Sequence, residues 1–483
     1  MRTTVRPIIR RYGDALPLTD IVSALSGAEL RTQTQEVTTE GLGDCDLNSP
    51  PEMVTSRWKR GNHRVPRVLF VSHEASRTGS VLALLRQAQW LVDECLVDPR
   101  FLIRTPGGLF DADLLEQFEA LGPTRMVSLR SERLRRAMRN RLGLRVSHAL
   151  DVLFALRTWI EYREVSLVWF NTAMNGPVHF DLALLRAPRV CHIHELRRFL
   201  NAFLPPHWMT AALDDVDIWA AVGEDVAKML ESDYQVSPDR IEILPGIAVI
   251  DHRAVLGRDQ KVHTQSSSAL SEALMDGVGA KFKVAAIGPP GTRKGSDMFV
   301  ATAIELARKG YGSRIAMTWL GGTEGTIDFE DLAEDVRAAG LSEMVEVRPS
   351  RPDMAAFYSE LDLLLIPSRQ ESFPLVMLEA ALFGVPLLTF QGSGGSDAFA
   401  SWGAGRRVPY LDSTAMAAEI VALVEDRGEL GRLGEAARVL VTERFGIDAI
   451  GGRCKEIFER SVRLPTRPLL GRVTRLLRSQ RPA

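Results

Sequence analysis

Short apolar runs alternate with helical patterns along most of this chain, in two series. The first series has apolar runs at Arg67–Ser72, Phe101–Ile103, Val165–Phe170, Val190–Ile193 and Ile218–Val222. The second has them at Lys283–Ile287, Ile315–Leu320, Val345–Val347, Leu363–Ile366 and Pro386–Phe390. Strands that alternate with helices are typical of parallel sheets covered by helices on both faces. The sequence therefore predicts an α/β fold with two doubly wound, Rossmann-like units.

The length of the chain agrees with this division, because 483 residues exceed what one hydrophobic core usually serves. We predict an N-terminal extension over 1–60, a first unit over 61–246, a second unit over 247–445, and a C-terminal helix with a basic tail over 446–483. The extension lacks strong periodicity, and Asn48–Pro51 is typical of a linker. A ligand site is expected in the cleft between the two units.

Composition narrows the class of protein. The formal net charge is -2, which disfavours a general polyanion binder, and basic runs must be judged locally. The four cysteines lie far apart without a CxxC pair, as expected in a reducing compartment and without a zinc site. We find no apolar segment typical of a secretory signal or a membrane span. We therefore expect a cytoplasmic protein.

The most informative segment runs from Glu371 to Pro386, directly after the strand 363–366 and a short loop. Pro374 suits the first turn of a helix, where its missing N–H costs nothing. Glu371 is then expected in the loop at the carboxyl edge of the sheet, and Glu379 about one and a half turns into the helix. Backbone amides near Phe373 and Leu375 would face an anion.

Two carboxylates beside an amide-lined anion pocket suit a sugar phosphate, because carboxylates accept from hydroxyls and amides hold phosphate oxygens. The simpler interpretation is a pair of surface carboxylates on an amphipathic helix, since Glu is common in helices. The position of the segment after an apolar strand and a Pro-Ser loop favours the binding site.

A second loop, Gly288–Asp297, carries Arg293 and Lys294 after the strand 283–287. It lacks the second glycine of a Walker loop, because Arg293 stands there, and a Walker ATPase is disfavoured. No convincing G-x-G-x-x-G follows the strand 67–72, which disfavours a dinucleotide oxidoreductase. A solvated basic turn remains the alternative for Arg293 and Lys294.

The second half of the chain resembles the family 4 glycosyltransferases, which have the GT-B fold. The resemblance is carried by Pro367-Ser368, Glu371-Ser372-Phe373-Pro374, Glu379-Ala380, Gly384-Val385-Pro386, Leu320-Gly321-Gly322, Tyr358–Asp362 and the Gly288…Lys294-Gly295 segment. It covers about 284–445 well and 67–246 more weakly. Members often carry an Arg soon after the first glycine of that segment, where this chain has Pro289-Pro290.

The resemblance implies roles for these residues. Glu379 would bind the ribose hydroxyls, and Glu371 would hold hydroxyls of the donor sugar. Lys294, with Arg293 nearby, would neutralise the diphosphate leaving group, which is why neither a metal nor another cofactor is expected. Retention of anomeric configuration is also implied. The other expected donor-binding residues are Gly288, Ser372, Phe373, Pro374 and Leu375.

The first half offers candidates at strand ends. Gly79 resembles part of the family's glycine loop, which approaches the donor phosphates. His192 and His194 would share one face of an extended segment, and the resemblance places His194 beside the donor sugar. A structural histidine in a packed loop is an equally weighted alternative. His73 and Asn171 are weaker candidates for contact with the acceptor.

Two basic runs suggest a further partner. The segments 125–145 and 463–481 are rich in arginine and carry leucines at helical spacing, which predicts basic amphipathic helices. Such helices can lie on an anionic membrane surface, here the inner face. A solvated face or a docked tail are the alternatives. Nucleic-acid binding is disfavoured, because no aromatic residues interleave the arginines.

The sequence thus predicts a retaining, metal-independent transferase. It would move a sugar from a nucleotide diphosphate sugar to a glycan or lipid-linked acceptor, in the synthesis of cell-surface polysaccharide or glycolipid. Two alternatives stay open. One is a sugar-nucleotide epimerase of the same fold, and the other is a non-catalytic partner protein. The Pro289-Pro290 replacement and the single glycine at Gly79 favour the partner protein.

Overall fold

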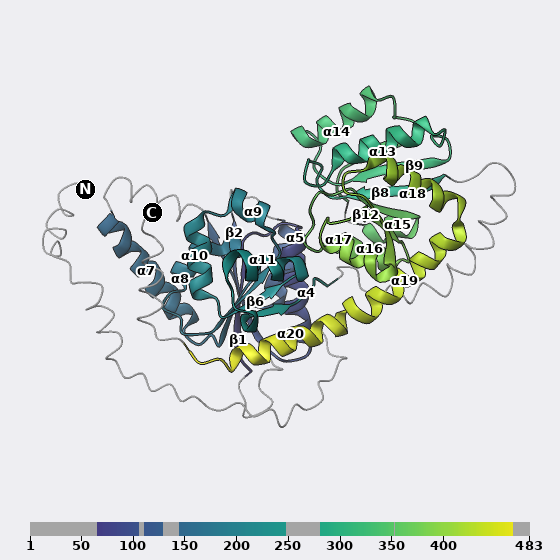
Figure 1. The fold of residues 1–483 in the computed structure, drawn as a ribbon. Helices are drawn as coiled ribbons and strands as arrows, with labels where there is room; N and C mark the ends of the chain where they lie inside the picture. Colours follow the sequence, from purple (N-terminus) through teal and green to yellow (C-terminus); the bar gives the residue numbers. More distant parts are fainter. Residues whose placement is uncertain (1–64, 106–110, 129–143, 248–280, 352, 467–483) are drawn as a thin grey trace, which may run out of the picture.

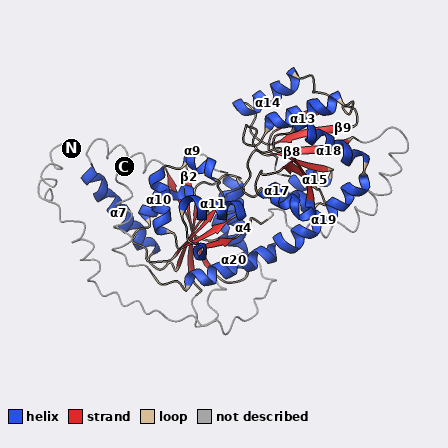
Figure 2. Cartoon of the chain, in the orientation of Figure 1, coloured by secondary structure: helices blue, strands red, loops and turns tan. Residues whose placement is uncertain are grey.

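A computed structural model describes residues 65–105, 111–128, 144–247, 281–351 and 353–466. Within these ranges the chain forms two parallel sheets flanked by helices, one in each half (Figures 1 and 2). The predicted extension 1–60 lies outside the described residues. The prediction of two doubly wound α/β units is confirmed.

The first sheet has seven strands in the order β3-β2-β1-β4-β5-β6-β7, all parallel. Its strands are β1 (Arg67–Ser72), β2 (Asp98–Thr105), β3 (Thr124–Ser128), β4 (Leu167–Phe170), β5 (Arg189–Ile193), β6 (Ile218–Ala221) and β7 (Ile241–Ile243). The helices between them are α4 (Gly79–Asp93), α5 (Ala112–Leu121), α7 (Leu144–Tyr162), α8 (Gly176–Asp181), α9 (Arg197–Phe203), α10 (Pro206–Asp215) and α11 (Glu224–Tyr234), with short turns η3 (Ala173–Asn175) and η4 (Pro238–Arg240).

The second sheet has six strands in the order β10-β9-β8-β11-β12-β13, also all parallel. Its strands are β8 (Phe282–Ile287), β9 (Ile315–Leu320), β10 (Val345–Arg348), β11 (Leu363–Ile366), β12 (Leu387–Phe390) and β13 (Gly405–Val408). Its helices are α13 (Ser296–Arg308), α14 (Ile327–Ala338), α15 (Met354–Ser359), α16 (Leu375–Leu382), α17 (Gly395–Phe399), α18 (Ser413–Glu425) and α19 (Arg427–Phe445), with a π-helical turn η5 (Ala400–Ala404).

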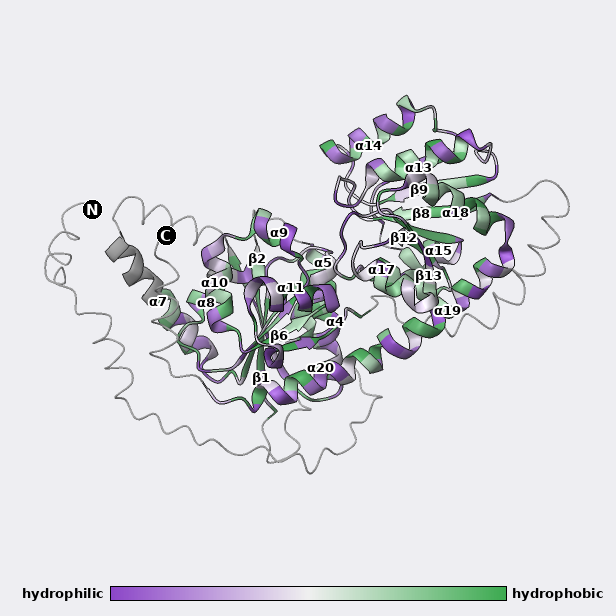
Figure 3. Cartoon of the chain, viewed as in Figure 1, coloured by the Kyte–Doolittle hydropathy of each residue, from purple (hydrophilic) through white to green (hydrophobic). Residues whose placement is uncertain are grey.

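Burial of the strands explains why their sequences are apolar throughout rather than alternating. Every residue of β4, β6, β11 and β12 is buried, because helices cover both faces of each sheet. Figure 3 shows the apolar strands inside each unit and the polar faces of the helices outside. In each unit, the carboxyl ends of the parallel strands and the loops that follow them lie at one edge of the sheet.

The last described helix links the two units. α19 ends at Phe445 in the second unit, and α20 (Ile447–Val462) runs back along the first unit (Figure 1). There Gly451 lies so close to the Trp90 ring of α4 that an added Cβ would stand 2.2 Å from the ring. The backbone of α20, the crossover helix, therefore packs directly against the Trp90 ring of the first unit.

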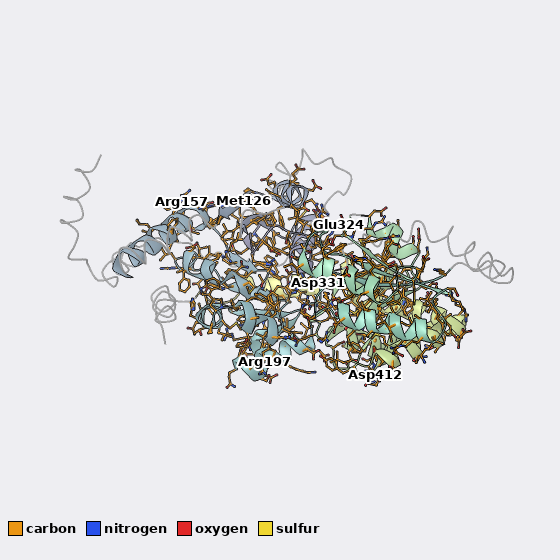
Figure 4. The ribbon with its side chains drawn as sticks, turned by 90° about the horizontal axis from the view of Figure 1, so that it is seen from above. Met126, Arg157, Arg197, Glu324, Asp331 and Asp412 are labelled. Carbon is orange, nitrogen blue, oxygen red and sulfur yellow. The ribbon has the colours of Figure 1, made fainter. Side chains whose placement is uncertain are left out.

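The predicted basic helix over 125–145 is wrong at its start. Residues Thr124–Ser128 form β3, the edge strand of the first sheet, paired in parallel with β2. Arg125 pairs with Glu161 of α7, so its charge is used within the unit. Figure 4 labels Met126 and Arg157 near each other, on the side of the first unit opposite Arg197. Residues 129–143 lie outside the described residues.

The second predicted basic helix, 463–481, falls mostly on 467–483, which also lie outside the described residues. At its described start the prediction is wrong: Arg463 only caps α20, and residues 463–466 are not helical. Among the described helices, none is long and apolar enough to cross a membrane.

Candidate functional site

Glu371 stands in the loop between β11 and α16, as predicted. Its backbone N–H donates to the Ser393 carbonyl at 2.7 Å, and its own carbonyl accepts from the Gly395 N–H at 2.9 Å. These bonds tie the loop to the glycine-rich turn after β12. The side chain is 6% exposed, so the fold buries a carboxylate at the carboxyl edge of the second sheet.

Three side chains surround the Glu371 carboxylate on one oxygen. Lys294 Nζ lies 2.7 Å from Glu371 Oε1, the Ser368 hydroxyl donates to it at 2.8 Å, and Arg293 approaches at 3.4 Å. Burial alone would raise the pKa of Glu371, but the charges of Lys294 and Arg293 outweigh it and hold that pKa below its ordinary value. The carboxylate is therefore ionised and paired.

Glycines let the Lys294 loop reach this position. Gly295 has a φ of +76°, and an added Cβ would stand 1.9 Å from the Pro367 carbonyl oxygen. Gly288, with a φ of +134°, lies beneath the lysine, whose Cε would meet an added Cβ at 3.2 Å. Only glycine permits both the backbone conformation and the close approach. The predicted Gly288, Arg293 and Lys294 thus come together with Glu371.

A small pocket opens beside Lys294 at the ends of β8 and β11. Apart from Lys294 and Ser368, its lining is mostly apolar, from Ala286, Ile287, Trp319, Leu365, Ile366, Pro367, Pro374 and Val376. The Trp319 indole N–H donates to the Gly288 carbonyl at 2.9 Å. A charged rim over an apolar floor can hold a ligand with one anionic and one apolar end.

Glu379 lies on α16, 8% exposed, and accepts a hydrogen bond from the Tyr358 hydroxyl at 2.8 Å. Burial, and then the charge of Glu379, raise the pKa of Tyr358 well above its ordinary value, so the phenol keeps its proton and donates. Tyr358 was not predicted as a site residue. Its place in the Tyr358–Asp362 motif was the only signal in the sequence.

The loop from Ser372 to Leu375 faces the first unit. Pro374 precedes the helix rather than standing in its first turn, since α16 begins at Leu375. An added Cβ on Gly79 would lie 3.7 Å from Leu375 Cδ1, and one on Gly223 would lie 3.4 Å from the Ser372 carbonyl oxygen. Phe373 packs on Phe445, with 5.3 Å between ring centroids. The start of α4 thus meets the start of α16.

On the first unit, His73 and Asn171 lie together at the ends of β1 and β4. His73 Nδ1 and its backbone N each lie 3.4 Å from Asn171 Oδ1, and Nε2 lies 3.4 Å from Glu74 Oε1. Asn171 is fully buried and also donates to Ser72 Oγ at 3.2 Å. Asn171 therefore orients the His73 side chain.

His194 leaves the end of β5, and its ring packs against that of His192 at 4.1 Å between centroids. The His194 Nε2 atom is buried without a hydrogen-bond partner among the described residues. Burial, and then the charges of His192 and His73, keep the pKa of His194 well below its ordinary value. His194 is thus a neutral imidazole, while His192 Nε2 lies 2.7 Å from the Leu244 carbonyl oxygen and has a structural role.

Among the described residues, no group of three or more His, Cys, Asp or Glu side chains gathers that could hold a metal ion. The two cations beside Glu371 are the groups that could hold a diphosphate. The expectation that no metal and no cofactor is needed stays a prediction.

Part of the second unit matches a known family. Residues 281–426 match the family described as Glycosyl transferases group 1. The D-inositol 3-phosphate glycosyltransferase of Arthrobacter sp. is 29% identical over 222 residues, covering 46% of this chain and 50% of that protein. The enzyme of the same description from Paenarthrobacter aurescens is 31% identical over 212 residues, covering 43% and 49%. The chain spans about half the length of the curated relatives that it matches.

Two solved structures share the overall architecture. The Anabaena protein HepE in complex with UDP has a TM-score of 0.62 at 16% identity, covering 82% of this chain and all of that one. WaaG, a glycosyltransferase involved in lipopolysaccharide biosynthesis, has a TM-score of 0.55 at 16% identity, covering 81% and 99%. At such identities these likenesses show the fold. The resemblance expected from the sequence is thereby confirmed: the chain has the GT-B fold, and its residues 281–426 are similar to the glycosyl transferases group 1 family.

Proposed function

We propose that the protein is a retaining glycosyltransferase that takes a sugar from a nucleotide diphosphate sugar. The observation that carries the proposal is the meeting of Lys294 and Arg293, in the loop after β8, with Glu371, in the loop after β11. Glu379, which is bonded to Tyr358, lies on α16, the helix that follows the Glu371 loop. Glu379 would accept from the ribose hydroxyls, and Glu371 from hydroxyls of the transferred sugar.

The chemical step needs stabilisation of a departing diphosphate. As the bond between the anomeric carbon and the phosphate oxygen breaks, negative charge grows on that oxygen, and a fixed Lys294 ammonium stabilises it. His194 lies on the opposite unit, where a neutral imidazole can accept or donate a hydrogen bond to the sugar. The acceptor hydroxyl would attack on the face from which the diphosphate leaves and pass its proton to the phosphate oxygen.

For the donor we propose a UDP-sugar, because the HepE structures contain UDP and UDP-glucose. For the acceptor we propose a hydroxyl of a phosphorylated cyclitol, a glycan or a lipid-linked sugar. The names of the curated relatives favour the first, and that of WaaG favours a cell-surface glycolipid. A cytoplasmic location, with contact at the inner face of the membrane, belongs to the same proposal.

The test begins with binding, in EDTA, of UDP, GDP, ADP and dTDP, followed by thermal unfolding. A ligand at a hundred times its dissociation constant adds about 2.7 kcal/mol to stability. We expect UDP to stabilise the wild type and the control Glu334→Ala, an exposed carboxylate of α14, but not Glu379→Ala. If no nucleotide stabilises the wild type, the donor site is wrong.

Turnover then separates the remaining functions. With UDP-glucose and either D-inositol 3-phosphate or a glycan acceptor, a transferase releases UDP and forms a glycoside. A new nucleotide-sugar formed without an acceptor would instead indicate an epimerase, and binding without any turnover would indicate a non-catalytic partner. Product NMR at the anomeric carbon tests retention.

A further inference from the structure

Glu195 occupies a position that the proposed chemistry does not use. It follows His194 at the end of β5, and its two carboxylate oxygens bind different loops. Oε2 accepts from the His194 backbone N–H at 3.2 Å, while Oε1 accepts from the Thr172 hydroxyl in the loop after β4. One side chain therefore bridges the ends of two neighbouring strands.

The bridge continues into the turn that holds Asn171. Thr172 accepts from the Met174 N–H at 3.0 Å and so caps η3. Within η3, the buried Asn175 amide donates to Asn171 Oδ1 and to the Val71 carbonyl, each at 3.3 Å. Since Asn171 in turn contacts His73, the chain of bonds runs from β5 through β4 to β1.

The charge of Glu195 makes this placement costly. Burial raises the pKa of Glu195, while the Thr172 hydroxyl and the charge of His73 oppose that rise. Among the described residues, this carboxylate accepts hydrogen bonds from the Thr172 hydroxyl and the His194 N–H and forms no ion pair with Lys or Arg. Glu195 is only half-buried, but holding its carboxylate by hydrogen bonds at a strand end still costs some stability unless its position is needed.

We infer that Glu195 is a positioning residue, whose carboxylate holds His194 and the Asn171–Asn175 turn in a single arrangement at the carboxyl edge of the first sheet. The inference rests on the proposed function, because it assigns His194 to the sugar. His194 Nε2 is buried without a partner and so cannot fix its own ring. The ring is instead held by its backbone and by packing on His192, and Glu195 fixes that backbone.

The test compares Glu195→Ala, Thr172→Val, Thr172→Ser and the double variant Glu195→Ala/Thr172→Val. Misplacement by about 1 Å can cost on the order of 100-fold in rate. We expect Glu195→Ala and Thr172→Val each to lower kcat by roughly 10- to 100-fold, with the dissociation constant of UDP unchanged. The double variant should be no worse than Glu195→Ala, and Thr172→Ser should recover most of the loss. Glu161→Ala, which removes a carboxylate paired with Arg125 at the β3 edge, is the control.

A second readout does not depend on turnover. The imidazole nitrogen NMR signals of His194, assigned with His194→Gln, should shift in Glu195→Ala and Thr172→Val and stay in place in Glu161→Ala. Additive losses in the double variant, or unchanged His194 signals in a folded Glu195→Ala protein, would overturn the inference. A wild type that transfers no sugar while the His194 signals still respond would count against the proposed function alone.

Discussion

Lys294 Nζ lies 2.7 Å from Glu371 Oε1, although the two residues belong to loops after different strands. The cation proposed to bind the diphosphate and the carboxylate proposed to bind the sugar thus form an ion pair with each other. Both side chains are largely buried, at 17% and 6% exposure. Removing one member of such a pair leaves the other charge uncompensated, which usually costs more than the pair itself contributes.

Lys294→Met should therefore affect stability and activity separately. We expect a loss of about 3 kcal/mol in the free energy of unfolding and a fall of about 100- to 1000-fold in kcat/KM. Adding Glu371→Gln should restore stability but not activity. Urea unfolding and steady-state transfer measure the two effects, with the exposed Lys309→Met as control. If the Lys294→Met variant kept a normal kcat/KM, Lys294 would have no role in the chemical step.

Tyr358→Phe tests the hydrogen bond to Glu379 without changing the packing of the ring. Loss of a buried hydrogen bond should lower stability by about 1–2 kcal/mol. Because Glu379 then loses one fixed partner, we expect about fivefold weaker UDP binding. In calorimetry, the wild type should prefer UDP over 2′-deoxy-UDP, and Glu379→Gln should lose that preference. Equal UDP affinities for wild type and Tyr358→Phe would show that Tyr358 does not orient Glu379.

Glu74 predicts a specific pH dependence of stability. Hydrogen bonds from His73, and then from Ser76 and Thr78, lower its pKa from 4.5 to about 2 against the effect of burial. A carboxyl whose pKa falls on folding stabilises the protein above its unfolded pKa and loses this effect as the pH drops toward the folded value. The contribution is at most about 3 kcal/mol, since a quarter of the side chain is exposed.

Glu74→Gln should accordingly be less stable than the wild type at about pH 6. The difference between the two proteins should shrink as the pH falls from about 4.5 toward 2. Chemical unfolding of both proteins at a series of pH values measures this difference in stability. The contributions of the other titratable groups are the same in both proteins and cancel in the difference. A gap that stayed constant across this range would mean that the Glu74 carboxylate is not held by its neighbours.

The strands that are apolar throughout were predictable, because burial on both faces leaves a continuous signal. Three strands were not: β3, β7 and β13, of which β7 is only three residues long. β3 begins with Thr124-Arg125, and β13 contains Arg406 and Arg407, whose charges resemble surface helix or loop. Their partners come from distant segments: Glu161 for Arg125, Glu419 and Glu429 for Arg406, and Asp397 for Arg407. A single sequence does not show such compensation.

The candidate site was likewise predicted only in part. Glu371, Glu379 and Lys294 were predicted as motif residues, and their roles stay predictions. What the motifs did not indicate is how the residues are held: the contact between Lys294 and Glu371, the Tyr358–Glu379 bond and the Glu195–Thr172 bridge all join segments separated by 21 to 77 positions. Such pairings depend on the order of the strands in each sheet. The sequence predicted that strands alternate with helices, but not this order.

The crossover helix offers a matched pair of glycines for the last prediction. A Cβ on Gly451 would stand 2.2 Å from Trp90, whereas a Cβ on Gly452 would meet nothing within 4 Å. Gly452→Ala should stabilise the protein by up to about 1 kcal/mol, because alanine favours a helix. Gly451→Ala gains the same propensity, but the clash pushes α20 from α4 and should leave it about 1–3 kcal/mol less stable.

The same pair tests whether this packing reaches the site. α4 begins at Gly79, which faces Leu375 of the second unit, so a displaced α4 would disturb the place where the two units meet. We expect Gly451→Ala to lower kcat for sugar transfer and Gly452→Ala to leave it unchanged, with UDP affinity the same in both. Urea unfolding and steady-state kinetics check this. If both variants shifted stability in the same direction, the close contact between α20 and Trp90 would not control how the crossover helix docks.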